Sequence, residues 1–227
     1  MNEVTIASPH DEGVWRVARG PDPLTLRDQP DPIADPTSAD PAMGNRYDRA
    51  VSDYHVWYFA TARAGCYGET LAPFRPDPDF LDVDDRDEGQ MGVGEMPADW
   101  RAKRVAIRAS FPEERPFLDV EDALTRSTLR GELRWLLKAL KCTDLDVSDI
   151  RSGDRRLTRW ISEWAWDHAV DDDVSFAGIR FVSRHNSDWE CWAVFSDVVV
   201  DVRERISILP TDDDLRAVAK LYKLTIF

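Results

Sequence analysis

The chain has 227 residues, enough for one large domain or two small ones. Hydrophobic residues make up 43% of it and include nine Trp, so it can bury a sizeable core. Its formal net charge of −14 argues against a general affinity for nucleic acid, because the phosphates of a polyanion would be repelled. A local basic pocket for one small anion and a basic protein partner both stay compatible with that charge.

The N-terminal sequence and the cysteines predict a cytoplasmic protein without a membrane anchor. No apolar run approaches the roughly 20 residues that cross a bilayer. The first residues, MNEVTIASPHDEG, lack the basic and apolar regions of a secretory signal. The three cysteines, Cys66, Cys142 and Cys191, have no metal-ligand spacing, and their odd number fits a reducing compartment. We therefore expect no membrane partner and no metal site.

The first predicted strand, Val14–Arg19, is followed by a long loop. Residues Gly20–Asn45 contain six prolines, which fix φ and remove backbone donors. A loop of this length in a compact domain is usually functional or disordered, and we predict that most of it is a solvated insertion. Gly44 and Asn45 mark a turn, and Arg46 follows just before the next apolar run.

We expect the chain to be organised around His55–Leu71, a predicted strand followed by a helix. The apolar run His55–Ala60 predicts a buried strand, and Thr61 is the expected cap of a helix from Ala62. One face of that helix joins four residues at i, i+3, i+4 and i+7: Ala62, Gly65, Cys66 and Glu69. Small residues predict that this face packs inward, which places Glu69 at its inner end. This stretch alone does not predict a functional role for Glu69. An ordinary ion pair between Glu69 and an Arg at the edge of the packed face is more frequent than a functional carboxylate.

The remaining predicted elements include both strands and helices. Ala72–Trp100 is rich in Pro, Asp and Gly, and its acidic stretch Asp77–Glu88 has no EF-hand spacing, so we predict a solvated surface excursion. Strands are predicted at Arg104–Ala109, Pro116–Val120, Gly178–Ser183, Cys191–Phe195 and Val198–Val202. Helices are predicted at Leu129–Leu140, at Leu157–His168 and, from a capping box of Thr211 and Asp214, through Tyr222. This mixture predicts an α+β domain with a mixed, partly antiparallel sheet flanked by helices.

Well-known catalytic motifs are missing from the sequence. It has no dinucleotide-binding glycine fingerprint, P-loop, nucleophile elbow or zinc-protease helix. The four histidines, His10, His55, His168 and His185, include no pair at ligand spacing. Nothing local activates Cys66, so we interpret it as a packing residue.

The order of several short segments nevertheless resembles the RES-domain family, the toxin half of Xre–RES toxin–antitoxin pairs. The matching segments are Trp15–Arg19, Asn45–Asp48, Val56–Ala60, Glu69, Phe117–Val120, Leu157–Trp160, Gly178–Arg184 and Trp192–Phe195. The family is named for an Arg, a Glu and a Ser. These look like Arg46 (or Arg16), Glu69 and Ser183 in this chain.

The resemblance implies one domain over residues 1–227, with a matching core of about 14–200 and inserted loops of about 20–45 and 72–100. It implies a fold similar to that of ADP-ribosyltransferase toxins. It also implies an enzyme that breaks the nicotinamide–ribose bond of NAD by phosphorolysis or hydrolysis. NAD would then be a substrate rather than a cofactor, with inorganic phosphate as a possible co-substrate. An Xre-family antitoxin and a toxin homodimer are the implied partners.

The same resemblance suggests a role for each site residue. Glu69 would stabilise the positive charge that develops on the ribose as nicotinamide leaves. Arg16 and Arg46 would bind the pyrophosphate, since guanidinium contacts phosphate oxygens in pairs. Tyr58 would stack on nicotinamide and donate from its hydroxyl, and Ser183 would orient the ribose or Glu69.

Other interpretations stay open from the residues alone. The two arginines would equally serve as surface ion-pair partners, Tyr58 as a core residue and Ser183 as a strand-end hydroxyl. Two other functions fit the same fold. One is transfer of ADP-ribose to a protein, and the other is an inactive interaction module.

Overall fold

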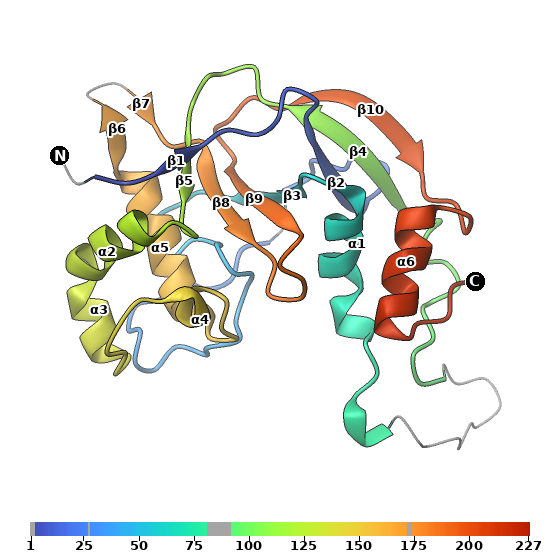
Figure 1. Cartoon of the computed structure of the whole chain (residues 1–227), viewed down its shortest axis with the longest axis horizontal. Coiled ribbons are helices and arrows are strands. Elements are labelled where there is room, and N and C mark those ends of the chain that lie inside the picture. Colours follow the sequence, from blue (N-terminus) through green and yellow to red (C-terminus); the bar gives the residue numbers. More distant parts are fainter. Residues whose placement is uncertain (1–2, 27, 81–91, 172–173) are drawn as a thin grey trace.

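The computed structural model describes residues 3–26, 28–80, 92–171 and 174–227 and contains a large mixed sheet with helices below one face (Figure 1). Eight strands form the sheet in the order β1-β5-β8-β9-β3-β2-β4-β10. Their bounds are β1 Ile6–Ala7, β2 Val14–Arg19, β3 Val56–Ala60, β4 Arg104–Ser110, β5 Phe117–Asp119, β8 Gly178–Val182, β9 Glu190–Phe195 and β10 Asp201–Ser207. A separate small pair joins β6, Ala169–Asp171, to β7, Val174–Ser175.

The sheet is antiparallel except between β5 and β8, and it opens between β3 and β2. β3 is in register with β9 over five residue pairs, and β2 with β4 over six. Between β2 and β3, however, only Trp15 and Ala60 are in register, so these strands diverge beyond that pair. Arg16 of β2 bridges the opening, because its Nη1 donates to the carbonyl oxygen of Tyr58 at 3.0 Å.

The helices form two groups under different halves of the sheet (Figure 1). They are α1 Arg63–Leu71, α2 Ala123–Glu132, α3 Arg134–Ala139, α4 Val147–Ile150, α5 Arg155–Asp167 and α6 Asp213–Tyr222, with 3-10 turns at Ala72–Phe74 and Pro78–Phe80. Apolar residues of α2, α3 and α5 pack with those of β5, β8 and β9 in one core. A second core joins α1 and α6 to the β2–β4 side. The opposite face of the sheet buries a third cluster, covered in part by Leu24 and Phe111.

Polar side chains on α5 hold the long loop that precedes β3. They are fully buried: Arg159, Ser162 and Glu163. The Glu163 carboxylate accepts from the backbone N–H groups of residues 50–52 at 2.9–3.1 Å. Arg159 donates to the carbonyl oxygens of Arg49 and Asp31, at 2.7 and 2.9 Å. Because buried charges require such partners, the loop is fixed against α5 through its own backbone.

The predicted fold class is confirmed, and most predicted strands lie within one residue of the observed ones. The expected single helix over Leu129–Leu140 is instead two, α2 and α3, since the backbone leaves helical geometry at Leu133. The predicted strand Val198–Val202 is displaced, because β10 begins at Asp201.

Both predicted helix caps are wrong. The N-cap of α1 is Ala62, without a side-chain bond, because the Thr61 hydroxyl instead donates to Glu190. The N-cap of α6 is Asp212, whose carboxylate accepts from the backbone N–H groups of Asp214 and Leu215. Each prediction missed by one residue.

Two further expectations concern the loops. The described residues of Gly20–Asn45 form no helix or strand, but they are bound to α5 and line the cavity described below, so this loop is not a merely solvated insertion. Much of the acidic stretch Asp77–Glu88 lies outside the described residues. No helix among the described residues is long and apolar enough to cross a membrane.

The α5 contacts generate a stability prediction. Glu163→Ala leaves three N–H groups without their acceptor, and that of Ala50 is buried, where an unpaired polar group costs roughly 1–3 kcal/mol. We expect the free energy of unfolding, measured by urea denaturation, to fall by about 1–3 kcal/mol. Asp167→Ala, at an exposed position of the same helix, should change it by less than about 0.5 kcal/mol. Equal losses in the two variants would contradict the proposed anchoring of the loop.

Candidate active site

A cavity of about 660 Å³ runs along β3. Every residue of β3 lines it, so it extends for roughly 17 Å at the usual rise of a strand. One end is formed by α1 and the β8–β9 turn, and the other by the end of β2 and by the loop around Pro30. The cavity is therefore an elongated cleft built from segments far apart in the sequence.

Glu69 lies at the α1 end of this cavity. The Ser183 hydroxyl donates to Glu69 Oε1 at 2.5 Å and accepts from the backbone N–H of His185 at 3.1 Å. Because the hydroxyl oxygen receives the N–H, its own proton is directed to the carboxylate. Glu69 is exposed rather than inward-facing, and among the described residues it forms no ion pair with Arg or Lys. Its carboxylate is thus oriented, but its charge is not neutralised.

The contact between Glu69 and Ser183 depends on two glycines of α1. Trp189, at the end of the β8–β9 turn, packs against the helix at Gly65 and Gly68. A Cβ atom at Gly68 would lie 1.9 Å from the Trp189 ring, and one at Gly65 would lie 2.9 Å from Ala60 Cβ. Only glycine therefore allows the hairpin to approach α1 this closely.

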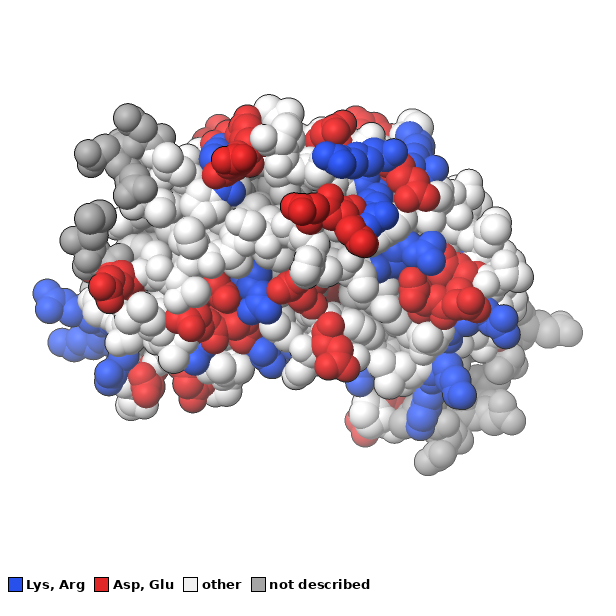
Figure 2. All heavy atoms as spheres, turned by 45° about the horizontal axis from the view of Figure 1, so that its top comes forward, with Lys and Arg blue, Asp and Glu red and all other residues white. Residues whose placement is uncertain are grey.

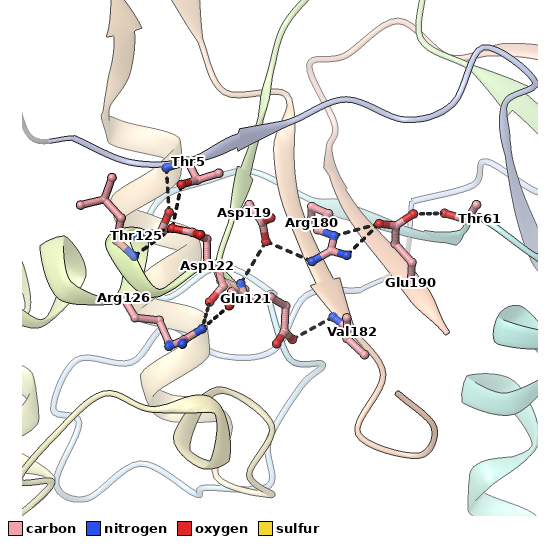
Figure 3. Close-up of polar contacts among 12 residues, drawn as sticks. Thr5, Thr61, Asp119, Glu121, Asp122, Thr125, Arg126, Arg180, Val182 and Glu190 are labelled. Carbon is pink, nitrogen blue, oxygen red and sulfur yellow. Dashed lines mark hydrogen bonds and ion pairs between the residues drawn. The ribbon is translucent and has the colours of Figure 1, made fainter. Parts of the chain in front are cut away.

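A polar network on the neighbouring strands fixes the strand end that carries Ser183 (Figure 3). Arg180 of β8 forms ion pairs with Asp119 of β5 at 3.2 Å and with Glu190 of β9 at 2.9 Å. The backbone N–H of Val182 donates to the Glu121 carboxylate at 2.9 Å. These contacts hold three adjacent strands in register directly before the site.

The predicted arginines line the cavity but are partly occupied by the protein itself. Arg46 Nη1 donates to the carbonyl oxygens of Ile150 and Ser152. Arg16 is 8% exposed, and its Nε donates to the carbonyl oxygen of Pro23, in addition to its bond across the opened strands. Arg16 therefore has a structural role that the sequence did not predict. Among the described residues, Nε and Nη2 of Arg46 have no hydrogen-bond partner, and Arg46 lines the cavity.

Tyr58 also lines the cavity, with its hydroxyl in a fixed arrangement. The hydroxyl donates to Asp48 Oδ1 at 2.9 Å and accepts from the backbone N–H of Tyr47 at 2.9 Å. Burial and the nearby Asp48 raise the pKa of Tyr58 well above its ordinary value, so the phenol stays neutral. Its single proton is used by Asp48, and the expected hydrogen bond from this hydroxyl to a ligand is therefore not available in this arrangement.

The cavity is cationic although the chain is acidic. Its described lining includes seven Arg and only three carboxylates: Arg16, Arg19, Arg46, Arg49, Arg104, Arg155 and Arg184 against Asp28, Asp48 and Glu69. The outer surface, by contrast, carries many acidic side chains (Figure 2). Charges within one Debye length, about 8 Å at physiological salt, dominate the local potential. The site thus favours an anionic ligand.

Comparison with known proteins identifies the family. The model of the RES domain matches residues 14–216 of the chain. The chain belongs to the RES domain family. A chain of the M. tuberculosis MbcT–MbcA toxin–antitoxin complex has the same fold, with 11% sequence identity, a TM-score of 0.52, and coverage of 96% of this chain and 90% of that one. No curated protein matches the sequence.

Two cavity residues of this RES domain were not predicted from its sequence. Arg184 and His185 follow Ser183 in the β8–β9 turn and line the cavity beside Glu69. Arg184 is exposed and, among the described residues, has no hydrogen bond or ion pair. Burial lowers the pKa of His185, nearby Arg184 adds to this effect and Glu69 opposes it. Their position directly after the serine in the matching segment was the available signal.

The floor of the RES-domain cavity contains two buried thiols, Cys66 and Cys191. Burial raises the pKa of Cys66 to about 12, so its thiolate is not populated near neutral pH. Its sulfur donates to the carbonyl oxygen of Trp15 at 3.0 Å. Among the described residues, no three His, Cys, Asp or Glu side chains are grouped so that they would hold a metal ion.

The glycine contact of α1 generates the second prediction. Gly68→Ala forces a methyl group into the Trp189 ring, and such overpacking typically costs about 1–3 kcal/mol. We expect a lower midpoint of urea denaturation and altered Trp fluorescence of the native state. Gly131→Ala is the matched control, since nothing lies within 4 Å of its added methyl group. In α2 that change should raise stability by roughly 0.5–1 kcal/mol, and a loss of the same size in both variants would refute the packing argument.

Proposed function

We propose that the chain is a toxin-type enzyme that cleaves the nicotinamide–ribose bond of NAD. The observation that carries the proposal is the Glu69 carboxylate, oriented by Ser183 and not paired with a cation, at one end of an otherwise cationic cavity. Membership of the RES domain family supports the same function. The elongated shape suits a dinucleotide, whose two nucleosides are separated by a pyrophosphate.

The proposed orientation places the nicotinamide ribose at Glu69 and the adenosine toward Val56. Cleavage leaves neutral nicotinamide, which keeps the bonding electron pair, so the leaving group needs no proton. Positive charge develops on the ribose, and a fixed carboxylate beside it stabilises that charge. Ser183 holds the Glu69 carboxylate in one orientation, which reduces the reorganisation needed during the reaction.

Phosphate groups would be bound by Arg46 and Arg184. Arg46 donates to carbonyl oxygens of the turn that joins α4 to α5. Arg184 approaches the same turn, since its Nη1 lies 3.6 Å from the position of a Cβ atom on Gly153. Two guanidinium groups thus approach the same turn without an ion pair to any described residue, and charge-assisted bonds to phosphate oxygens would satisfy them.

The proposed reaction has several forms, which differ in the molecule that accepts the ADP-ribose group. Attack by water gives ADP-ribose, and attack by inorganic phosphate gives ADP-ribose phosphorylated at the anomeric carbon. Transfer to a protein side chain is the alternative enzyme function, and an inactive interaction module is the alternative without chemistry. Product analysis by mass spectrometry separates all four.

An antitoxin is the proposed protein partner. The similar structure is that of a toxin–antitoxin complex, which supports an antitoxin for this chain as well. An Xre-family protein and a homodimer of the toxin remain part of the proposal. Co-purification with the product of the adjacent gene, followed by light scattering, measures both.

Glu69→Gln tests the chemistry. It keeps the shape of the side chain and removes the charge that stabilises the ribose, so we expect the rate of nicotinamide release to fall by about 10²–10³-fold. Chromatographic detection of nicotinamide measures this rate, and circular dichroism checks the fold. Glu204→Gln, on exposed β10, should leave the rate unchanged. Absence of nicotinamide release from the folded wild-type protein would remove the enzymatic proposal altogether.

Arg184→Ala tests the phosphate contact. A hydrogen bond to a charged group contributes roughly 1.5–3 kcal/mol, so KM for NAD or for inorganic phosphate should rise by about 10–100-fold. The value of kcat at saturation should change little, because the contact is made equally in the ground state. Steady-state kinetics with each reactant varied in turn shows which KM rises. Arg203→Ala on β10 is the control, and an unchanged KM for both reactants would exclude Arg184 from binding.

A further inference from the structure

The face formed by α2 and α3 has a charge opposite to that of the whole chain. Residues 123–141 contain five Lys and Arg against a single Glu, in a chain with a net charge of −14. Blue side chains gather accordingly at the end of the molecule where these helices lie (Figures 1 and 2). We call the exposed part of this face the α2–α3 surface, and it consists of Arg130, Arg134, Trp135, Lys138 and Lys141.

Most cationic side chains of this surface form no hydrogen bond or ion pair within the described part of the chain. Arg130 forms an ion pair with Asp144 at 3.1 Å. Arg134, Lys138 and Lys141 are exposed, and in the described part of the chain their side chains have no hydrogen bond or ion pair. The i, i+4 spacing of Arg134 and Lys138 places them on the same side of α3. Their like charges repel one another, so this pair does not stabilise α3.

Trp135 lies among these cations with 47% of its surface exposed. Its ring meets Trp160 of α5 edge to face, with the centroids 4.9 Å apart. Trp135 is therefore held on one side by α5 and open to solvent on the other. A Trp that packs against α5 and is followed and preceded in the sequence by exposed Arg and Lys has the composition of an interaction hot spot.

We propose that the α2–α3 surface binds a protein segment that presents carboxylates around an apolar side chain. The carboxylates would pair with Arg134, Lys138 and Lys141, and the apolar side chain would cover the open side of Trp135. Charge complementarity selects an acidic partner, and the exposed ring selects one with an apolar anchor. This surface lies outside the cavity, and the inference does not depend on the proposed reaction.

Two other occupants fit less well. The α3 part of the surface has six residues, or roughly 9 Å of helix, with Arg130 before it and Lys141 after it, so a short acidic segment matches its length. A nucleic acid would extend beyond it over a molecule whose net charge repels phosphates. A second copy that used the same surface in a two-fold dimer would bring its cations against those of the first copy.

The test uses two 16-residue peptides, one of Glu and Lys with central Leu residues and an excess of Glu, and one with the Leu residues replaced by Ser. Titration calorimetry with the full-length protein in 150 mM salt should show binding of the Leu peptide. Arg134→Glu, Lys138→Glu and Lys141→Glu together should weaken it at least tenfold. Trp135→Ala should weaken the Leu peptide several-fold and leave the Ser peptide unaffected.

A variant with the same change in net charge is the control: Arg203→Glu, Arg205→Glu and Arg216→Glu, all exposed on β10 and α6. It should bind the Leu peptide as the wild type does, and thermal denaturation should show both triple variants folded. Equal weakening by the two triple variants, or no binding of the Leu peptide, overturns the proposal. So does tighter binding of a 16-nucleotide DNA strand, or self-association in sedimentation that the first triple variant abolishes.

Discussion

The close approach of Trp189 to the glycine face of α1 is the constraint on which the site depends. It joins the β8–β9 hairpin, which carries Ser183, to the helix that carries Glu69. A side chain at Gly68 would push the hairpin away from α1, because its Cβ atom would lie 1.9 Å from the Trp189 ring. The Glu69 carboxylate is therefore oriented by packing in a core to which Glu69 itself does not belong. Tyr222 of α6 strengthens this arrangement, because its hydroxyl donates to the Gly68 carbonyl oxygen at 3.2 Å.

The rest of the cavity depends on contacts made to the backbone. α5 fixes the loop through carbonyl oxygens and N–H groups, and Arg16 holds the opened strands through the carbonyl oxygens of Pro23 and Tyr58. Such contacts place no demand on the side chains of the loop. The loop can therefore carry polar and Pro-rich sequence and still form a fixed wall. This explains how a segment with the composition of a solvated insertion takes part in the site.

The sequence predicted the elements better than their partners. The apolar runs of β3 and β9 and the alternation of β4 follow directly from burial, and these strands were predicted closely. The break at Leu133 was not visible, because the leucine spacing continues across it. Glu69 and Ser183 were paired only through the family resemblance, since their contact spans 114 residues. The bonds of Arg16 and Tyr58 were missed because a backbone carbonyl or N–H partner leaves no pattern in a sequence.

The distribution of cations bears on the acceptor of the proposed reaction. Arg184 follows the end of β8, and Arg19 ends β2, three strand spacings or about 14 Å away across the sheet. Because β2 and β8 run in opposite directions, these two arginines also lie toward opposite ends of the cavity. The single pyrophosphate of a dinucleotide cannot contact both. Hydrolysis leaves one cationic group without a role, since water needs no such group. An oxyanion acceptor bound at Arg184, next to the ribose held by Glu69, gives both arginines a role. Phosphorolysis is therefore the favoured form of the proposal.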